Sequence, residues 1–70
     1  MPKYVAKMKD SCHDYVLCST SDFMEAIEAC LRKVKESHAS EAKITKEALT
    51  NRGYYCMGYS SREVYIEEEE

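Results

Sequence analysis

Apolar and polar residues alternate over residues 3 to 9 of the chain. In an extended segment one side carries Tyr4, Ala6 and Met8, and the other carries Lys3, Val5, Lys7 and Lys9. Alternation with a period of two predicts a half-buried β-strand. A polar turn follows, and the β-branched and aromatic run YVLCS at residues 15 to 19 predicts a second strand. Together the two segments predict an antiparallel hairpin.

The period changes over residues 22 to 37, which we expect to form a long amphipathic helix. Its apolar residues recur at helical spacing and make one stripe: Phe23, Ile27, Cys30, Leu31 and Val34. Either Ser21 or Asp22 suits the N-cap position, and Asp22 with Glu25 three residues later resembles a capping box.

The second half of the chain predicts a shorter helix and two further strands. In the segment TKEALTNRG, Thr45 suits an N-cap, and Gly53 is placed to end the helix in the left-handed conformation. Strands are expected at residues 54 to 59 and 63 to 67. The predicted fold class is α+β, with a small antiparallel four-stranded sheet in the order β-β-α-(short α)-β-β. The long helix is expected to pack on one face of this sheet.

The register of the last hairpin decides which tyrosines face outward. We centre its turn on Ser60 and Ser61, which sets Gly58 opposite Glu63. The inward pairs are then Met57 with Val64 and Tyr55 with Ile66, and the outward pairs are Cys56 with Tyr65 and Tyr54 with Glu67. The predicted core is Tyr4, Ala6, Met8, Phe23, Ile27, Cys30, Leu31, Val34, Tyr55, Met57, Val64 and Ile66.

Length and charge limit the functions open to the chain. Seventy residues make one domain, expected at residues 1 to 66, with an acidic tail at residues 67 to 70. The net charge is −3, but the last four glutamates carry −4, so the rest is nearly neutral. This balance excludes a strongly basic nucleic-acid surface. A core this small also favours stabilisation by dimer formation.

One segment resembles a known RNA-binding motif. RGYYCMGY, residues 52 to 59, is similar to the RNA-reading octamer of RRM domains, in which two exposed aromatic residues stack on bases. Tyr54 keeps one of these positions and Cys56 replaces the other. An RRM needs a helix and a strand after the octamer, and eleven residues follow Tyr59, so we do not assign this fold.

A weaker nucleic-acid interpretation stays open as the alternative function. Tyr54 and Tyr65 would stack on the bases of a single strand, and cations would meet its phosphates. Those cations are Arg52, Lys3, Lys7 and Lys9. Against this interpretation, Glu63 and Glu67 are expected on the same face.

The cysteines and the N-terminal segment favour the cytoplasm. Neither a signal-peptide pattern nor a membrane-spanning run is present, so the four cysteines are expected as thiols. Cys12, His13 and Cys18 flank a turn, but their spacing is not that of a zinc knuckle. We therefore expect no metal and no cofactor. The catalytic sequence motifs are also missing, which indicates a protein that is not an enzyme.

The favoured function is protein binding through an exposed sheet face. Tyrosine and arginine are enriched at interface hot spots, which makes Arg52, Tyr54, Cys56 and Tyr65 the candidate site. A homodimer is expected, since it would cover this face. The layout of a hairpin followed by an amphipathic helix is similar to that of many small bacterial and phage proteins. Some of these act as adaptors or inhibitors on host machinery, which is what the resemblance implies here.

Overall fold

The protein folds as one antiparallel four-stranded sheet with two helices on the same side, as the sequence predicts. The structure is a computed structural model that describes residues 2–57 and 62–69. Its elements are β1 (Lys3–Lys9), β2 (Asp14–Thr20), α1 (Phe23–Ser37), a 3₁₀ turn (Ala39–Glu41), α2 (Ala42–Asn51), β3 (Tyr54–Cys56) and β4 (Glu63–Glu69).

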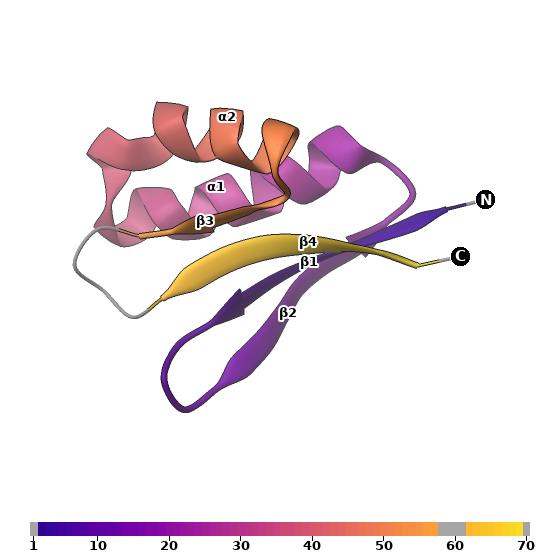
Figure 1. Cartoon of the computed structure of the whole chain (residues 1–70), viewed down its shortest axis with the longest axis horizontal. Coiled ribbons are helices and arrows are strands. Elements are labelled where there is room, and N and C mark those ends of the chain that lie inside the picture. Colours follow the sequence, from indigo (N-terminus) through magenta and orange to yellow (C-terminus); the bar gives the residue numbers. More distant parts are fainter. Residues whose placement is uncertain (1, 58–61, 70) are drawn as a thin grey trace.

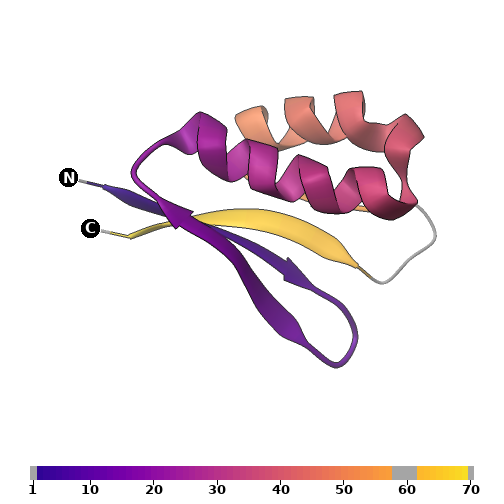
Figure 2. The ribbon, with the colours of Figure 1, turned by 180° about the vertical axis from the view of Figure 1, so that it is seen from behind.

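The strands lie in the order β2-β1-β4-β3, so the first and last strands of the chain form the centre of the sheet. Figures 1 and 2 show α1 and α2 side by side above the sheet, and the described chain leaves the opposite face without a covering layer. α1 lies over β1, β2 and β4, whereas α2 packs against α1 and β3.

The long helix forms where its apolar stripe predicts it. Asp22 is the N-cap, and its side chain accepts a hydrogen bond of 3.0 Å from the Met24 N–H. The structure thus decides between the two candidate caps in favour of Asp22. At the other end the His38 N–H donates to the Val34 carbonyl. The predicted range of the helix is confirmed.

The second helix is longer than expected, and its predicted N-cap is wrong. α2 begins at Ala42, so Thr45 lies inside it, fully buried. The Thr45 hydroxyl donates to the Glu41 carbonyl at 2.7 Å. A threonine four residues after a helical carbonyl can form this bond inside a helix, so its presence does not mark a helix start.

Gly53 ends the second helix as predicted. Its φ of 84° lies in the left-handed region that favours glycine. The Gly53 N–H donates to the carbonyls of Ala48 and Leu49, and the Gly53 carbonyl accepts from the Ile66 N–H at 2.8 Å. The chain therefore turns from the helix directly into the sheet.

The register of the last hairpin differs from the prediction by two residues. The observed pairs are Tyr54 with Tyr65, Tyr55 with Val64 and Cys56 with Glu63. A shift of two preserves the side on which each side chain lies, because the side-chain period of a strand is two. The predicted inward and outward sets are therefore confirmed, although their partners are wrong. The expected turn at Ser60 and Ser61 lies outside the described residues.

Glu67, Glu68 and Glu69 of the predicted acidic tail continue the last strand and remain exposed, and Glu70 lies outside the described residues. β4 extends to Glu69, and its last three residues pair with β1: Glu67 with Val5, Glu68 with Tyr4 and Glu69 with Lys3. Pairing with a lysine-rich strand offsets the repulsion between neighbouring glutamates.

The hydrophobic core lies between the helices and the sheet, and it includes every residue of the predicted core. Leu49 of α2 is fully buried in it, although the sequence did not single it out. The buried members are Ala6, Ala26, Ile27, Ala29, Cys30, Val34, Leu49, Met57 and Val64; the partly buried ones are Tyr4, Met8, Leu17, Cys18, Phe23, Leu31, Tyr55 and Ile66.

Candidate functional site on the open sheet face

The sheet face turned away from the helices, called the open face below, carries a row of side chains across all four strands. Val16 of β2 pairs with Lys7 of β1, Lys7 pairs with Tyr65 of β4, and Tyr65 pairs with Tyr54 of β3. Residues that pair directly across strands share a face. Two of these side chains are strongly exposed, Val16 at 65% and Tyr54 at 46%.

The row next to it is charged. Asp14 of β2 pairs with Lys9 of β1, which pairs with Glu63 of β4, which pairs with Cys56 of β3. On the other side of the Val16–Tyr54 row, Val5 is only 6% exposed, although it lies on the open face. The open face thus has a row in which Lys7 lies between Val16 and the two tyrosines, with further polar side chains beside it.

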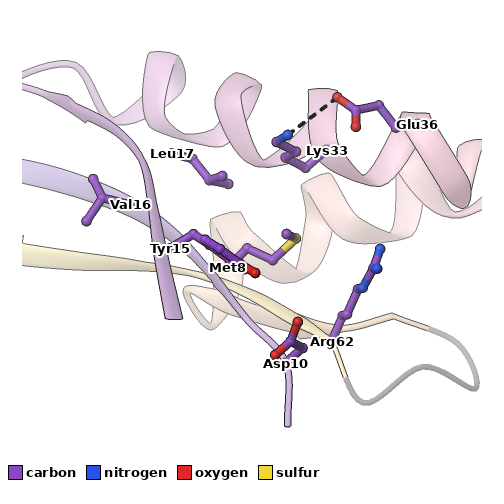
Figure 3. A pocket seen from close by; sticks show the side chains of 8 residues that line it. All are labelled: Met8, Asp10, Tyr15, Val16, Leu17, Lys33, Glu36 and Arg62. Atoms are coloured by element: carbon purple, nitrogen blue, oxygen red, sulfur yellow. Dashed lines mark ion pairs between the residues drawn. The ribbon is translucent and has the colours of Figure 1, made fainter. Parts of the chain in front are cut away.

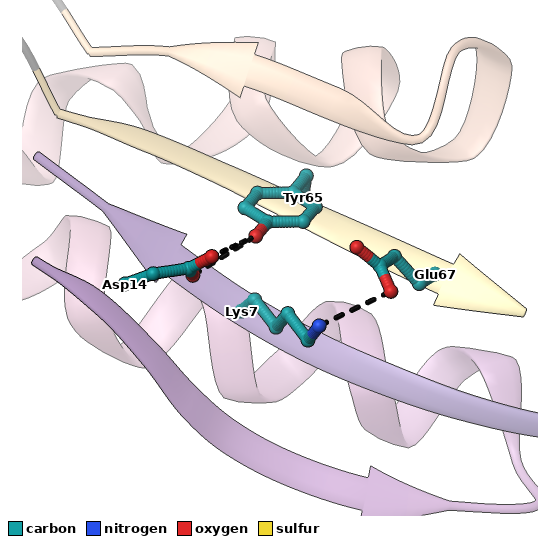
Figure 4. Close-up of polar contacts among 4 residues, drawn as sticks. All are labelled: Lys7, Asp14, Tyr65 and Glu67. Carbon is teal, nitrogen blue, oxygen red and sulfur yellow. Dashed lines mark hydrogen bonds and ion pairs between the residues drawn. The ribbon is translucent and has the colours of Figure 1, made fainter.

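Tyr65 occupies the middle of the open face and reaches across β1. Its hydroxyl donates to the Asp14 carboxylate, with both carboxylate oxygens 2.9 Å away (Figure 4). The Lys9 ammonium lies 5.8 Å from the centre of the Tyr65 ring. Partial burial and the bond to Asp14 raise the pKa of the Tyr65 phenol to about 12. The hydroxyl therefore remains a hydrogen-bond donor at neutral pH.

The two central strands exchange ion pairs on this face. The Lys7 ammonium lies 3.1 Å from a Glu67 carboxylate oxygen (Figure 4), and Lys9 lies 3.9 Å from Glu63. Each pair links β1 to β4. These half-exposed contacts contribute little stability each, but they fix the positions of the charges around the tyrosines.

Arg52 and Tyr54 form the outer corner of the site. The Arg52 guanidinium lies 5.1 Å from the centre of the Tyr54 ring, within the range of a cation–π contact. Cys56 follows on the same strand, and its thiol donates to a Glu63 carboxylate oxygen at 3.3 Å. That bond raises the pKa of the Cys56 thiol, which favours the unreactive protonated form.

The structure places Tyr54, Cys56 and Tyr65 on the open face, and Arg52, at the end of α2, lies against the Tyr54 ring. Sequence reasoning did not include Val16, because the second strand was predicted without a register. Strand β2 also has a bulge, where its register against β1 shifts between Ala6 and Lys7. The shift leaves Leu17 between the Val16–Lys7 and Cys18–Ala6 pairs, so it changes the side of the residues that follow, whereas Val16 keeps one unbroken register with Asp14 and Tyr15.

For the nucleic-acid alternative, the structure brings together the two tyrosines expected to stack on bases. The lysines expected to bind phosphates, however, are already paired with carboxylates. Tyr54 and Tyr65 are direct cross-strand neighbours. However, Lys7 and Lys9 are paired with Glu67 and Glu63. A phosphate would have to displace these carboxylates, so the observed pairs favour a protein partner over a nucleic acid.

The candidate metal-binding residues Cys12, His13 and Cys18 lie in different surroundings. Cys12 and His13 are in the β1–β2 turn, where both backbone N–H groups donate to the Asp10 carboxylate at 2.9 and 2.7 Å. Cys18 is opposite Ala6 and packs against the core. In the described part of the chain, no three His, Cys, Asp or Glu side chains converge as a metal site requires. Cys30 is a core residue, and burial raises the pKa of its thiol to about 12.

A hollow of about 600 Å³ lies on the helix side of the first hairpin. Figure 3 shows Met8, Tyr15 and Leu17 lining it from the strands, with the Lys33–Glu36 ion pair on α1 above them. Tyr15 stacks on His13 with ring centres 5.7 Å apart. The hollow is open to solvent, and Lys33 and Glu36 in its lining pair with each other.

Neither the helices nor comparisons with known proteins point to a function for this site. Over residues 2–57 and 62–69, neither helix has the length and apolar run needed to cross a membrane. No family model, no curated protein and no solved structure gives a significant match to this chain.

Proposed function

We propose that this protein is a small non-enzymatic interaction module of the adaptor or inhibitor type, which pairs with a second copy of itself through the open face. The observation that carries the proposal is the Val16–Tyr54 row, which runs across the whole sheet. The proposed compartment is the cytoplasm, since all four cysteines are free thiols.

The composition of the open face supports a protein partner. Protein interfaces combine a central patch of aromatic and apolar side chains with a polar rim, and they favour tyrosine and arginine. Here Val16, Tyr65 and Tyr54 form the central patch, and Asp14, Lys9 and Glu63 lie along one side of it. Most of these side chains are already held by contacts within the chain, so their ordering costs little on binding.

The charge pattern supports a second copy as that partner. The lysines of the open face lie on β1 and most of its carboxylates lie on the adjacent β4. A two-fold axis parallel to the strands, between β1 and β4, sets the lysine strand of one copy over the glutamate strand of the other. Sheets that pack face to face in this way form a core between them. Dimer formation would thus bury the uncovered face of a small protein.

Sedimentation velocity at increasing protein concentration tests the proposal. We expect a monomer–dimer equilibrium below about 1 mM, and we expect Tyr54→Ser to shift it strongly towards monomer. Val16→Lys should act in the same direction, because it places a further charge in the Val16–Tyr54 row. Tyr15→Ser is the matched control, since Tyr15 is 43% exposed against 46% for Tyr54 but pairs with Met8 on the helix side.

Two results would contradict the proposed dimer. One is a wild-type protein that stays monomeric over the whole concentration range. The other is an equal shift of the monomer–dimer equilibrium by Tyr54→Ser and Tyr15→Ser, which would show that self-association does not depend on the open face. At a protein concentration where the wild type is monomeric, the melting temperatures of both variants should stay near that of the wild type, because both rings are half exposed.

A further inference from the structure

The outer surface of the helical layer contains a second candidate interface. A groove of about 350 Å³ runs along α1 on the side facing α2. Its apolar floor consists of Met24, Ile27 and Leu31, which recur on α1 at intervals of three and four residues. Met24 is 46% exposed, an unusual position for a long apolar side chain on a helix with a well-formed buried stripe.

Cations dominate the rim of this groove. Arg32 and Lys35 follow the floor on α1, and Lys46 faces them from α2; Glu28 is the one carboxylate of the lining. Lys35 lies in the last turn of α1, where a cation also suits the helix dipole. Neither Arg32 nor Lys46 lies in the last turn of α1, so the helix dipole does not account for their positions. These two side chains give the groove its positive rim.

These cations differ from three lysines elsewhere on the molecule, whereas Lys3 and Lys43 are likewise in no ion pair among the described side chains. Lys7, Lys9 and Lys33 each have a carboxylate partner within the chain. Among the described side chains, no ion pair holds Arg32, Lys35 or Lys46. An apolar floor beside unpaired cations is complementary to a segment that carries apolar side chains and carboxylates.

We propose that the α1–α2 groove binds an acidic amphipathic helix of a partner protein. An apolar stripe of that helix would lie on Met24 and Leu31, and its carboxylates would pair with Arg32, Lys35 and Lys46. The lining of α1 from Met24 to Lys35 spans about 17 Å at 1.5 Å per residue, which matches about three turns of a bound helix. This surface lies on the opposite side of the molecule from the open face, so one dimer would present two such grooves and bind a repeated target with increased avidity.

The test is fluorescence anisotropy with a labelled peptide of about 14 residues, built of glutamate and alanine with leucines at positions i, i+3, i+4 and i+7. We expect binding at about 150 mM salt, and no binding of the same peptide with lysine in place of glutamate. Lys46→Glu should weaken binding about tenfold. Lys43→Glu is its matched control, because Lys43 makes the same charge change on α2 without lining the groove.

A second pair of variants tests the apolar floor. Met24→Ser should weaken binding of the acidic peptide, whereas Ile44→Ser should not, although Ile44 is 57% exposed on α2. Equal losses for Lys46→Glu and Lys43→Glu, or no binding by the wild type, would overturn the proposal. Repeating the titration with the Tyr54→Ser variant separates the two proposals, since groove binding should persist in a protein that no longer dimerises.

Discussion

Tyr65 shows how one side chain organises a surface. Its ring lies on β4, its hydroxyl reaches Asp14 on β2, and Lys9 of the strand between them lies near its ring. The side chain thereby ties together three strands on a face that has no other layer to support it. Cys56, on the same face, has its thiol engaged by Glu63, a bond that raises the pKa of the thiol and favours its protonated form.

Tyr65→Phe should lower the free energy of unfolding by about 1 kcal/mol at neutral pH, because the bond to Asp14 is lost. The unfolded phenol has a pKa of about 10, and in the folded protein that pKa is raised to about 12. The stabilisation is therefore complete below pH 10 and is lost as the pH rises towards 12. Urea unfolding of both proteins across this range measures the difference. If the difference in unfolding free energy between the wild type and Tyr65→Phe stays constant as the pH rises towards 12, the hydroxyl bond to Asp14 is not what raises the pKa of Tyr65.

At the scale of elements, the caps explain where each helix begins and ends. Asp22 accepts a bond from the first turn of α1, and Gly53 ends α2 with a positive φ. The 3₁₀ turn between the helices is held to β3 by Tyr55, whose hydroxyl donates to Glu41 at 2.6 Å. This bond raises the pKa of the Tyr55 phenol and links the helix connection to the short strand.

Asp22→Ala should destabilise the protein by about 1 kcal/mol, because the Met24 N–H loses its acceptor. Ser21→Ala is the control, since the adjacent serine was an equal candidate in the sequence but does not cap the helix in the structure. Thermal unfolding by circular dichroism distinguishes the two. If Ser21→Ala costs as much as Asp22→Ala, the helix begins one residue earlier than described.

Gly53→Ala should cost about 1 kcal/mol, because alanine is strained at a φ of 84°. A Cβ at this position would lie 3.8 Å from the Ile66 carbonyl oxygen, an ordinary contact, so the cost is conformational and not steric. Gly53→Asn should lose less, since asparagine tolerates the left-handed region better. Equal losses for the two substitutions would point to packing instead of backbone conformation.

At the scale of the whole molecule, the two ends of the described chain form the centre of the sheet. β1 and β4 pair along their full lengths, from Lys3 with Glu69 to Lys9 with Glu63. The helical layer covers one face, and Leu49 anchors α2 to it. One face is thus committed to the core, and the described chain leaves the other without a covering layer.

Leu49→Ala should lower the free energy of unfolding by about 3 kcal/mol, because it leaves a cavity under α2. Ile44→Ala on the same helix is the control and should cost under about 0.5 kcal/mol, since Ile44 is 57% exposed. Guanidinium unfolding of the two variants gives the comparison. Similar costs would mean that α2 contributes little to the core.

The sequence by itself determined the elements, their order and the two sides of the first, third and fourth strands. Alternation in residues 3 to 9 and the helical stripe from Phe23 to Val34 depend on periods that local geometry imposes, so a single sequence reveals them. For the same reason the outward placement of Tyr54, Cys56 and Tyr65 was predictable even with a register two residues off.

Only the tertiary structure decided what depends on contacts between distant segments. Thr45 resembles a cap in the sequence, but packing of the α2 start buried it, and Leu49 entered the core because α2 lies against α1 and β3. Glu67, Glu68 and Glu69 became strand because β1 was there to pair with them, through Val5, Tyr4 and Lys3. Val16 joined the Val16–Tyr54 row because the register of β2 against β1 sets it opposite Lys7. Each of these outcomes depends on residues far apart in the chain, whose pairing no local pattern encodes.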